Sequence, residues 1–378
     1  MYKKNIVSTS TKNQNRQSIY QYIKNNGPVS RQDIVVNVRL SIPTVTQHLQ
    51  YLEEKHYIAI SDFKKNTGGR NASTYIAVND CRMAIGIFIS ANHITIVSVD
   101  FFGSVTHSHR EHIKFDLTDD GYLKKLGELV EMIKTEAQIS DKQLLGVGIS
   151  VPSLISENDQ RIIYGLTLDF NNKTKEDFTK YIPYTTRLFH DSLVAGFAEV
   201  WTQNNIDNAV YLNLNNNIGG CIIFNKEIYS GNSNRAGEIG HIKLITNSQK
   251  KCYCGKYGCF DTLCNATVLD SYTNGNLEEF FALLSQHDSG AESIWNDYLN
   301  HLALAIHNLH MIFDCNIIIG GYVGSFINPY MEDLCSRIDQ KSFFDEKALD
   351  YALPCKYKIE ATAAGAAIQF ISEFIENI

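Results

Sequence analysis

Three cysteines and one histidine lie close enough in the sequence to bind one metal ion. The histidine is His241, and the thiols that follow it are Cys252, Cys254 and Cys259. Three thiolates and one imidazole form a closed, tetrahedral ligand set of the kind found in structural zinc sites. Two glycines inside the loop let the backbone double back, so that closely spaced thiolates can converge. We therefore predict a structural Zn²⁺ site. Glu238, three residues before the histidine, is a possible ligand-binding carboxylate beside this site.

A disulfide pair and a chance cluster of buried thiols are the two alternative interpretations of this loop. The chain has nine cysteines, an odd number, and no apolar signal segment follows Met1, which argues against a disulfide framework. The other cysteines lie among apolar neighbours and are expected to be buried thiols: Cys81, Cys221, Cys264, Cys315, Cys335 and Cys355.

The composition describes a folded protein with an uneven distribution of charge. The 378 residues are 44% hydrophobic and 20% charged, and a chain of this length is expected to form two or three domains. The net charge of -7 divides into about +6 over residues 1–80 and about -13 over the remainder. A basic N-terminal part indicates a polyanionic partner. The apolar runs are too short to cross a bilayer, so we expect a cytoplasmic protein without a membrane partner.

Residues 1–80 have the pattern of three short helices. A first helix is expected over residues 15–25, where Asn26-Gly27-Pro28 ends it. The sequence Ser30-Arg-Gln-Asp33 has the form of a capping box and predicts the start of a second helix. A third helix is expected after Ser41, because serine is a good N-cap and the proline that follows is tolerated in a first turn.

The third helix and the segment after it carry the features of a DNA-binding winged helix-turn-helix. Apolar positions of that helix face the core, which leaves short polar side chains outward, as suits a major groove. Strands are expected at residues 57–61 and 74–78, and the basic loop 64–70 between them looks like a wing that approaches phosphates. A protein-interaction module is the alternative. The predicted DNA contacts are Arg31, Ser41, Thr44, Thr46, Gln47 and Gln50 in the helices, and Gly68, Gly69 and Arg70 in the loop.

From residue 81 onward, strands and helices alternate, which indicates α/β architecture. We therefore divide the chain into a DNA-binding domain over residues 1–80 and a second domain over residues 81–378. The expected strands are 83–90, 94–100, 145–151, 210–214, 220–224 and 317–320. The expected helices are 122–137, 265–285, 291–313 and 361–375.

Taken together, these features resemble the ROK family of repressors and sugar kinases. The resemblance rests on the Thr67-Gly-Gly-Arg70 loop, the strand pair at 83–100, the sequence Ala236-Gly-Glu-Ile-Gly-His241 and the cysteine loop, and it covers nearly the whole chain. It implies an actin-like, ribonuclease H-like sugar kinase fold of two α/β lobes. The DNA-binding head resembles that of the family's repressors, which implies a homodimer or a dimer of dimers that binds two half-sites.

The resemblance also implies a set of sugar-binding residues. Asp191 stands where the family's kinases have their catalytic base, and a carboxylate there can hydrogen-bond a sugar hydroxyl with or without catalysis. Glu238 and His241 match the family's sugar-contacting pair, and Asp261 replaces a glutamate that touches the sugar. Lone carboxylates are otherwise normally solvated at the surface. The predicted sugar-binding set is Ser153, His190, Asp191, Glu238, His241 and Asp261.

The phosphate-binding features of the family's kinases are missing. Where those kinases have Asp-x-Gly-Gly-Thr, this chain has Phe88 in place of the aspartate and Ser90-Ala-Asn92 in place of the glycines and threonine. A phenyl ring cannot orient magnesium, and added β-carbons crowd a phosphate cradle. A second phosphate loop begins with asparagines at 215–217. We therefore predict no kinase activity, so that Asp191 is a vestigial base.

These observations predict a sugar-responsive transcriptional regulator, expected to be a repressor of carbohydrate uptake or catabolism. Its partners would be operator DNA and a small sugar effector, and residues 166–178 are expected to close over the sugar. A sugar kinase with a remodelled nucleotide site is one alternative. A DNA-binding protein controlled by a protein partner, with a relic sugar cleft, is the other.

Overall fold

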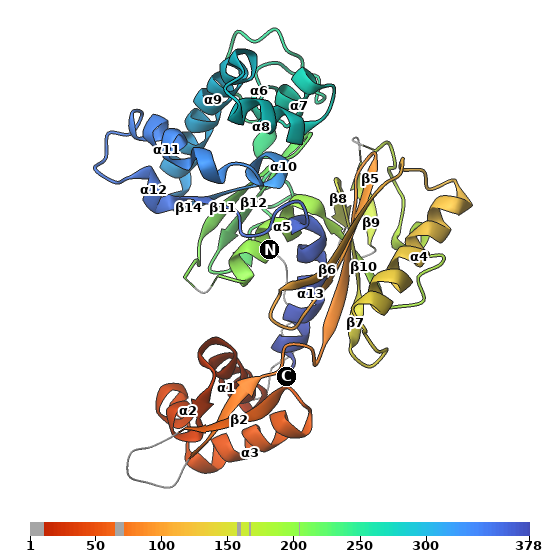
Figure 1. Cartoon of the computed structure of the whole chain (residues 1–378), viewed down its shortest axis with the longest axis vertical. Coiled ribbons are helices and arrows are strands. Elements are labelled where there is room, and N and C mark those ends of the chain that lie inside the picture. The colour runs from red at the N-terminus through yellow and green to blue at the C-terminus, as the bar shows by residue number, and fades with distance from the viewer. Residues whose placement is uncertain (1–10, 65–71, 157–159, 166–167, 204) are drawn as a thin grey trace.

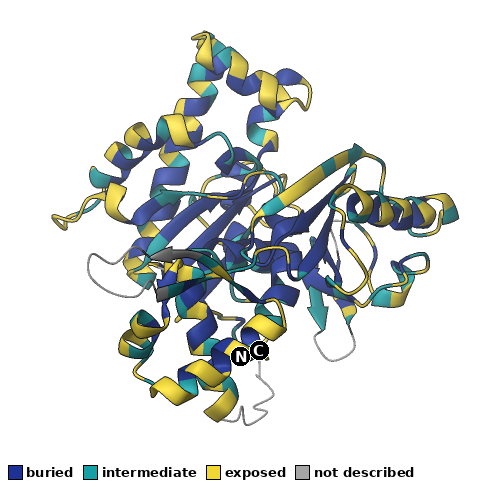
Figure 2. Ribbon diagram, turned by 60° about the horizontal axis from the view of Figure 1, so that its bottom comes forward, coloured by how far each residue is buried: buried dark blue, intermediate teal, exposed yellow. Residues whose placement is uncertain are grey.

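The chain forms a small N-terminal head and two larger lobes (Figure 1). The computed structural model describes residues 11–64, 72–156, 160–165, 168–203 and 205–378. Buried residues run along the central strands of both lobes, and exposed residues cover the outer turns of the helices (Figure 2). Within the described residues, no helix has both the length and the apolarity needed to cross a bilayer.

The head is a three-helix unit with a small antiparallel sheet in the order β1-β3-β2. Its elements are α1 (Thr11–Asn26), β1 (Val29–Ser30), α2 (Arg31–Val38), α3 (Ile42–Glu54), β2 (Ile58–Lys64) and β3 (Ala72–Ala77). The predicted capping box is confirmed, because Ser30 Oγ accepts from the Asp33 backbone N–H at 3.2 Å while the Asp33 carboxylate accepts from the Ser30 N–H at 2.9 Å. The first helix begins four residues earlier than the predicted residue 15.

The N-lobe is built on a mixed five-stranded sheet in the order β10-β7-β4-β5-β6. Its elements are β4 (Met83–Ile89), β5 (His93–Val99), β6 (Val105–His112), α4 (Asp120–Glu136), β7 (Leu144–Val151) and β10 (Thr186–His190), with a separate hairpin of β8 (Leu154–Ser156) and β9 (Arg161–Tyr164). β4 pairs with β5 as the predicted hairpin, and it runs parallel to β7. All seven residues of β4 are buried, as expected for a central strand covered on both faces.

The C-lobe has a second five-stranded sheet in the order β13-β12-β11-β14-β15. Its strands are β11 (Ala209–Leu214), β12 (Ile218–Phe224), β13 (Glu227–Ile228), β14 (Asn316–Gly320) and β15 (Ala352–Pro354). Its helices are α6 (Asp261–Cys264), α7 (Thr267–Asp270), α8 (Leu277–Ser285), α9 (Ser289–Phe313), α10 (Gly321–Gly324), α11 (Met331–Asp339) and α12 (Ala348–Tyr351). The helix predicted over 265–285 is wrong as one element, because Asn274 and Gly275 adopt positive φ angles of 54° and 90° that break it.

Two helices lie between the sheets of the two lobes. α13 (Ala361–Glu376) packs on β4 and β7 of the N-lobe, α5 (Asp191–Trp201) packs on β11 and β12 of the C-lobe, and the two helices pack on each other. The contact between α13 and β4 is close, since a β-carbon on Gly86 would lie 1.8 Å from the Ala363 carbonyl oxygen. The far end of α13 reaches the head, where the Phe374 ring lies 5.7 Å from that of Tyr57.

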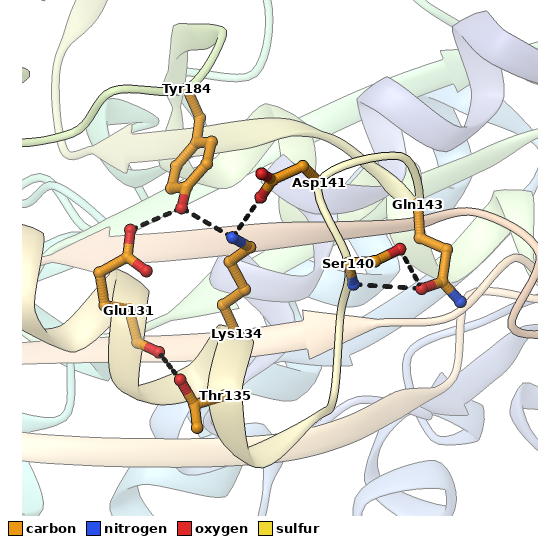
Figure 3. A network of polar contacts seen from close by, with 7 residues as sticks. All are labelled: Glu131, Lys134, Thr135, Ser140, Asp141, Gln143 and Tyr184. Carbon is orange, nitrogen blue, oxygen red and sulfur yellow. Dashed lines mark hydrogen bonds and ion pairs between the residues drawn. The ribbon is translucent and has the colours of Figure 1, made fainter.

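A polar network on the outer side of the N-lobe fixes the end of α4 (Figure 3). The Lys134 ammonium donates to Asp141 and to the Tyr184 hydroxyl, and that hydroxyl donates to Glu131. Next to it, a shallow groove of about 740 Å³ runs along α4 between Lys124 and Glu136. None of the predicted site residues lines this groove, so we assign the network to positioning of the helix.

Candidate zinc, ligand and nucleic-acid sites

The four predicted metal ligands come together in the structure. One ligand atom from each of His241, Cys252, Cys254 and Cys259 lies within 4.8 Å of the other three. The Sγ atoms of Cys254 and Cys259 are 3.8 Å apart, and Cys252 Sγ is 3.7 Å from His241 Nδ1. Bonds of about 2.3 Å to a tetrahedral zinc ion place sulfur ligands about 3.8 Å apart, so the residues present fit this ion.

The backbone of the cysteine loop is folded so that the thiols converge. Gly255 and Gly258 have positive φ angles of 84° and 75°, as the turns require. A side chain at Gly258 would collide with Ile245, since its β-carbon would lie 1.9 Å from that carbonyl oxygen. The Cys252 backbone N–H donates to the Lys256 carbonyl at 2.8 Å, which closes the loop.

The predicted sugar-binding residues of the N-lobe lie at one edge of its sheet. β7 and β10 are parallel, and Val151 is paired with His190, so both strands end at the same level. Ser153 follows the first strand, and Asp191 follows the second as the first residue of α5. Ligand sites of open α/β sheets commonly form at this carboxyl edge of parallel strands.

Asp191 is held as a buried carboxylate. Its Oδ1 accepts from the Ser192 backbone N–H at 2.6 Å and from the Ser192 hydroxyl at 3.0 Å, and it lies 3.4 Å from His190 Nε2. Burial raises the pKa of Asp191, the His190 ring lowers it, and the charge of Glu238 raises it. Ser192, next to Asp191, packs against Gly219 of β12, and the segment that carries Glu238 packs on the adjacent Gly220, so the same strand positions both carboxylates.

Glu238 and His241 are positioned by a short 3-10 helix that packs tightly on β12. The helix spans Ile239–His241, and a β-carbon on the preceding Gly237 would lie 2.5 Å from the Gly220 carbonyl oxygen. Glu238 Oε2 is 3.9 Å from His241 Nε2, the ring nitrogen that faces away from Cys252. A carboxylate beside the second nitrogen of a metal-ligating histidine orients the ring.

Asp261 occupies a position between the cysteine loop and β12. Its Oδ1 accepts from the Ile218 backbone N–H at 2.7 Å, and its Oδ2 lies 3.9 Å from Cys252 Sγ. Burial raises the pKa of Asp261, whereas the Ile218 N–H lowers it. Asp261 therefore links the cysteine loop to the sheet. Its contact with a sugar stays a prediction.

Several buried polar atoms beside Asp191 have no hydrogen-bond partner within the described chain. They are Ser153 Oγ, His190 Nδ1 and Asn213 Oδ1. Asn213 also donates to the Ser192 hydroxyl at 3.1 Å, so it supports the residue that holds Asp191. Buried polar atoms are nearly always paired in folded proteins, and an unpaired group calls for an explanation such as a ligand. Ser192 and Asn213 were not predicted as site residues, and Asn213 joins the site only through its contact from β11 to Ser192 on α5.

Side chains from both lobes meet near the end of β4, where the family's kinases were expected to have their first phosphate loop. Phe88 is buried, and the Ser90 hydroxyl donates to the His93 carbonyl at 3.1 Å. Tyr322, from α10 of the C-lobe, has its ring 5.4 Å from the Arg110 guanidinium of β6. Burial raises the pKa of Tyr322, whereas Arg110 and a hydrogen bond with Ser90 lower it. This contact was not predicted, because 212 residues separate Arg110 from Tyr322.

Four of the nine predicted DNA contacts lie on α3 of the head. Thr46, Gln47 and Gln50 are exposed, and Thr44 is partly exposed. Two predicted contacts have local partners: Ser41 caps α3 by accepting from the Thr44 N–H at 3.3 Å, and Arg31 Nη1 donates to Thr46 Oγ1 at 3.4 Å. The remaining predicted contacts, Gly68, Gly69 and Arg70, lie outside the described residues.

The head contacts the body at the end of α5 through partly buried side chains. The Lys24 ammonium of α1 lies 3.9 Å from the centre of the Trp201 ring, at the last residue of α5. Burial lowers the pKa of Lys24 to about 8. Glu199, on the same helix as Trp201, accepts backbone N–H groups of Lys356 at 2.9 Å and Tyr357 at 2.8 Å, and burial raises its pKa to about 7. The helix that begins at Asp191 therefore ends against the head.

Comparison with known proteins places this architecture in a family. The pattern of the ROK family matches residues 84–373, and that of winged helix-turn-helix DNA-binding domains matches residues 12–59. The chain is 23% identical to the xylose repressor of Caldicellulosiruptor bescii over 97% of this chain and 98% of that protein. It is 25% identical to the N-acetylglucosamine repressor of Escherichia coli O157:H7 over 67% of this chain and 63% of that protein.

Solved structures share the fold. A ROK family transcriptional regulator, a homologue of the Escherichia coli Mlc protein, superposes with a TM-score of 0.71 at 22% identity, covering 97% of both chains. The ROK glucokinase of Streptomyces griseus, in complex with glucose and AMPPNP, superposes with a TM-score of 0.63 at 18% identity, covering 76% of this chain and 98% of that one. Because the family pattern spans most of the sequence, this chain belongs to the ROK family and carries a winged helix-turn-helix head.

Proposed function

We propose that this protein is a sugar-responsive, cytoplasmic transcriptional regulator, acting as a repressor, whose head binds operator DNA. The observation that carries the proposal is the group of unpartnered polar atoms beside Asp191, in a chain that also has a DNA-binding head. A hydroxyl-rich ligand would supply the hydrogen bonds that Ser153 and His190 lack. The similarity to repressors named for xylose and N-acetylglucosamine supports a sugar as this ligand.

The sugar would bind between the lobes without being phosphorylated. Asp191 follows β10 of the N-lobe and Glu238 lies on a segment packed against β12 of the C-lobe, and one ligand would contact both. Phosphoryl transfer needs groups that position a metal ion and cradle phosphates. In this chain the buried Phe88 stands where the family's kinases have their metal-binding aspartate, and Tyr322 of the C-lobe contacts Arg110 of the N-lobe nearby. Asp191 therefore acts as a hydroxyl acceptor for the sugar and no longer as a catalytic base.

Zinc would stabilise the part of the site that belongs to the C-lobe. A structural zinc ion supplies a rigid tetrahedral crosslink between its ligands. His241 would be fixed by that crosslink, and Glu238 lies beside its free ring nitrogen. Asp261 fastens the cysteine loop to β12 from the other side. The zinc site would thus keep the Glu238 carboxylate in a fixed position for sugar binding.

The α5 helix offers a route from the sugar to the head. Asp191 is its first residue, and Trp201, its last, lies under the Lys24 ammonium of the head. A sugar that contacts Asp191 would bias the position of α5, and a shift of this helix would be transmitted to α1. A ligand changes such an equilibrium only as far as it binds one arrangement more tightly than the other.

In a dimer, a small rotation of each head would change the distance between the two recognition helices. Half-sites on duplex DNA lie about one helical turn apart, so two heads fit only at a matching spacing. We propose a homodimer, or a dimer of dimers, as the DNA-binding form. Sugar would then alter operator affinity by changing how well the second head of the dimer matches its half-site once the first head has bound.

A thermal-shift screen tests the proposal. The zinc-loaded protein is heated with neutral aldopentoses, hexoses and N-acetylhexosamines, with sugar phosphates, and with ATP and magnesium. Only a ligand that binds the folded state raises the melting temperature. We expect one class of neutral sugar to raise it in the wild-type protein and to have no effect on Asp191→Asn. A response to ATP and magnesium, or no response to any sugar, would contradict the proposal.

A further inference from the structure

A small basic pocket lies on the head between α1 and α3. Its volume is about 240 Å³, and we call it the head pocket. Its lining residues are Lys12, Arg16, Gln47, His48, Gln50, Tyr51 and Glu54. Small-molecule sites commonly measure about 300–1,000 Å³, so this pocket suits a single small group better than a whole metabolite.

Arg16 is the main cation of the head pocket, and no carboxylate pairs with it among the described residues of the head. Its side chain is only 9% exposed, and its Nε has no hydrogen-bond partner among the described residues. One face of the guanidinium lies 3.8 Å from the centre of the Tyr51 ring, and Nη2 makes one long hydrogen bond of 3.5 Å to Asn13. A guanidinium that stacks on an aromatic ring and has an N–H without a partner among the described residues is suited to donate to a phosphate.

The other charged groups of the head pocket leave it positive. Lys12 is exposed at the first turn of α1, and His48 is only 2% exposed. Burial lowers the pKa of His48, and the charges of Arg16 and Lys12, which line the same pocket, lower it further. The one carboxylate among the lining residues, Glu54, accepts a hydrogen bond from Gln50 at 3.0 Å.

The position of the head pocket identifies the kind of phosphate that can reach it. Gln47 and Gln50 line the pocket and also lie on the exposed face of α3 that is predicted to enter the major groove. A phosphate bound here would therefore flank the groove that the same helix occupies. We propose that the head pocket binds a backbone phosphate of the operator duplex, with Arg16 and Lys12 as the contacts. This inference rests on the proposed function, since it requires that the head binds DNA.

The salt dependence of DNA binding tests this proposal. The wild-type protein first enriches a duplex from a pool of random 30-base-pair DNA, so that the selection itself supplies the binding sequence. Binding of the fluorescein-labelled duplex is then measured by anisotropy at several salt concentrations for wild type, Lys12→Gln, Arg16→Gln and the double variant. Each phosphate contact contributes about 0.9 to the slope of log K against log salt. We expect the slope for the double variant to be smaller in magnitude by about 0.9 per bound head. We also expect its affinity for the duplex to fall roughly tenfold, with unchanged sequence preference.

Matched controls separate the head pocket from general charge and from folding. Lys142→Gln removes the same charge from an exposed position on the body and should leave both slope and affinity at the wild-type values. If Arg16→Gln unfolds the head, the exposed Lys12→Gln decides the question. Wild-type slope and affinity in a folded Lys12→Gln or Arg16→Gln protein would overturn the proposal.

Two further outcomes distinguish the head pocket from the proposed function. If the wild-type protein enriches no duplex, the proposed function itself fails. If it binds DNA with a slope that the pocket variants do not change, while inorganic phosphate raises the melting temperature of wild type and not of the double variant, the pocket serves a small phosphate compound and our assignment to DNA is wrong.

Discussion

Replacing Gly219 with alanine should displace the group that positions Asp191 while leaving the zinc ligands and the head untouched. Gly219 lies on β12, paired with Asn213 on β11. A β-carbon at this position would lie 2.0 Å from Ser192 Oγ, far inside the 3.4 Å at which ordinary contact begins. The Ser192 side chain must therefore leave its place.

The cost can be worked out from the hydrogen bonds that Ser192 makes. Its hydroxyl donates to Asp191 at 3.0 Å and accepts from Asn213 at 3.1 Å. A buried polar group that loses its partner costs about 1–3 kcal/mol. If that cost falls on the ligand-binding form, the affinity for sugar falls roughly 5- to 150-fold, since about 1.4 kcal/mol corresponds to a factor of ten.

Calorimetric titration with the stabilising sugar measures this effect. Ser192→Ala removes the same hydrogen bonds without a collision, at a cost of about 1 kcal/mol or roughly fivefold in affinity. In the double variant the closest remaining atom to the new β-carbon is Ser192 Cβ at 3.0 Å, so most of the collision is relieved. We expect the double variant to resemble Ser192→Ala. Wild-type affinity in folded Gly219→Ala, or simple additivity in the double variant, would refute the reasoning.

Three further predictions concern the metal, the buried carboxylate and the junction with the head. Cys254→Ser should reduce bound zinc from one ion per chain to a small fraction and lower the melting temperature, whereas Cys335→Ser, outside the cluster, should keep its zinc by elemental analysis. Glu199 holds its proton to about pH 7 in the folded protein but releases it near 4.5 when unfolded, so the folded state binds the extra proton between these values. The free energy of unfolding should therefore fall by up to about 3 kcal/mol as the pH rises through this window, and denaturant titrations of Glu199→Gln should lack this component. Trp201→Ala removes the ring under Lys24, so it should leave sugar binding and DNA binding intact when each is measured alone but weaken the effect of sugar on DNA affinity. Trp201→Phe keeps a ring and should keep this effect. An equal effect of sugar in both variants would contradict the α5 route.

The features that could be predicted from the sequence are those encoded over short distances. The capping box at Ser30 and the serine cap at Ser41 are complete within four residues, and both are confirmed. The zinc ligands share one loop with Glu238 close by, so their spacing was sufficient to predict the cluster. The β4–β5 hairpin was predicted because only a short turn separates its two apolar runs.

The features that escaped prediction depend on contacts between distant segments. β10 is a strand of five residues, and it is recognisable only from its parallel pairing with β7. The α5 helix begins with two buried polar residues, Asp191 and Ser192, so it lacks an apolar start that would mark it as a core helix. The contact between Arg110 and Tyr322 and the stacking of Arg16 on Tyr51 arise from tertiary packing, for which no local pattern exists.

The most direct test of the account measures DNA binding with and without the sugar. The enriched duplex is titrated with wild-type protein and with Asp191→Asn, in the presence and absence of the sugar that raises the melting temperature. We predict that the sugar changes the affinity of the wild-type protein for the duplex at least about tenfold, within the usual range of coupling between sites, and that Asp191→Asn binds DNA normally but does not respond. An unchanged affinity at saturating sugar would contradict the claim that the cleft controls the head.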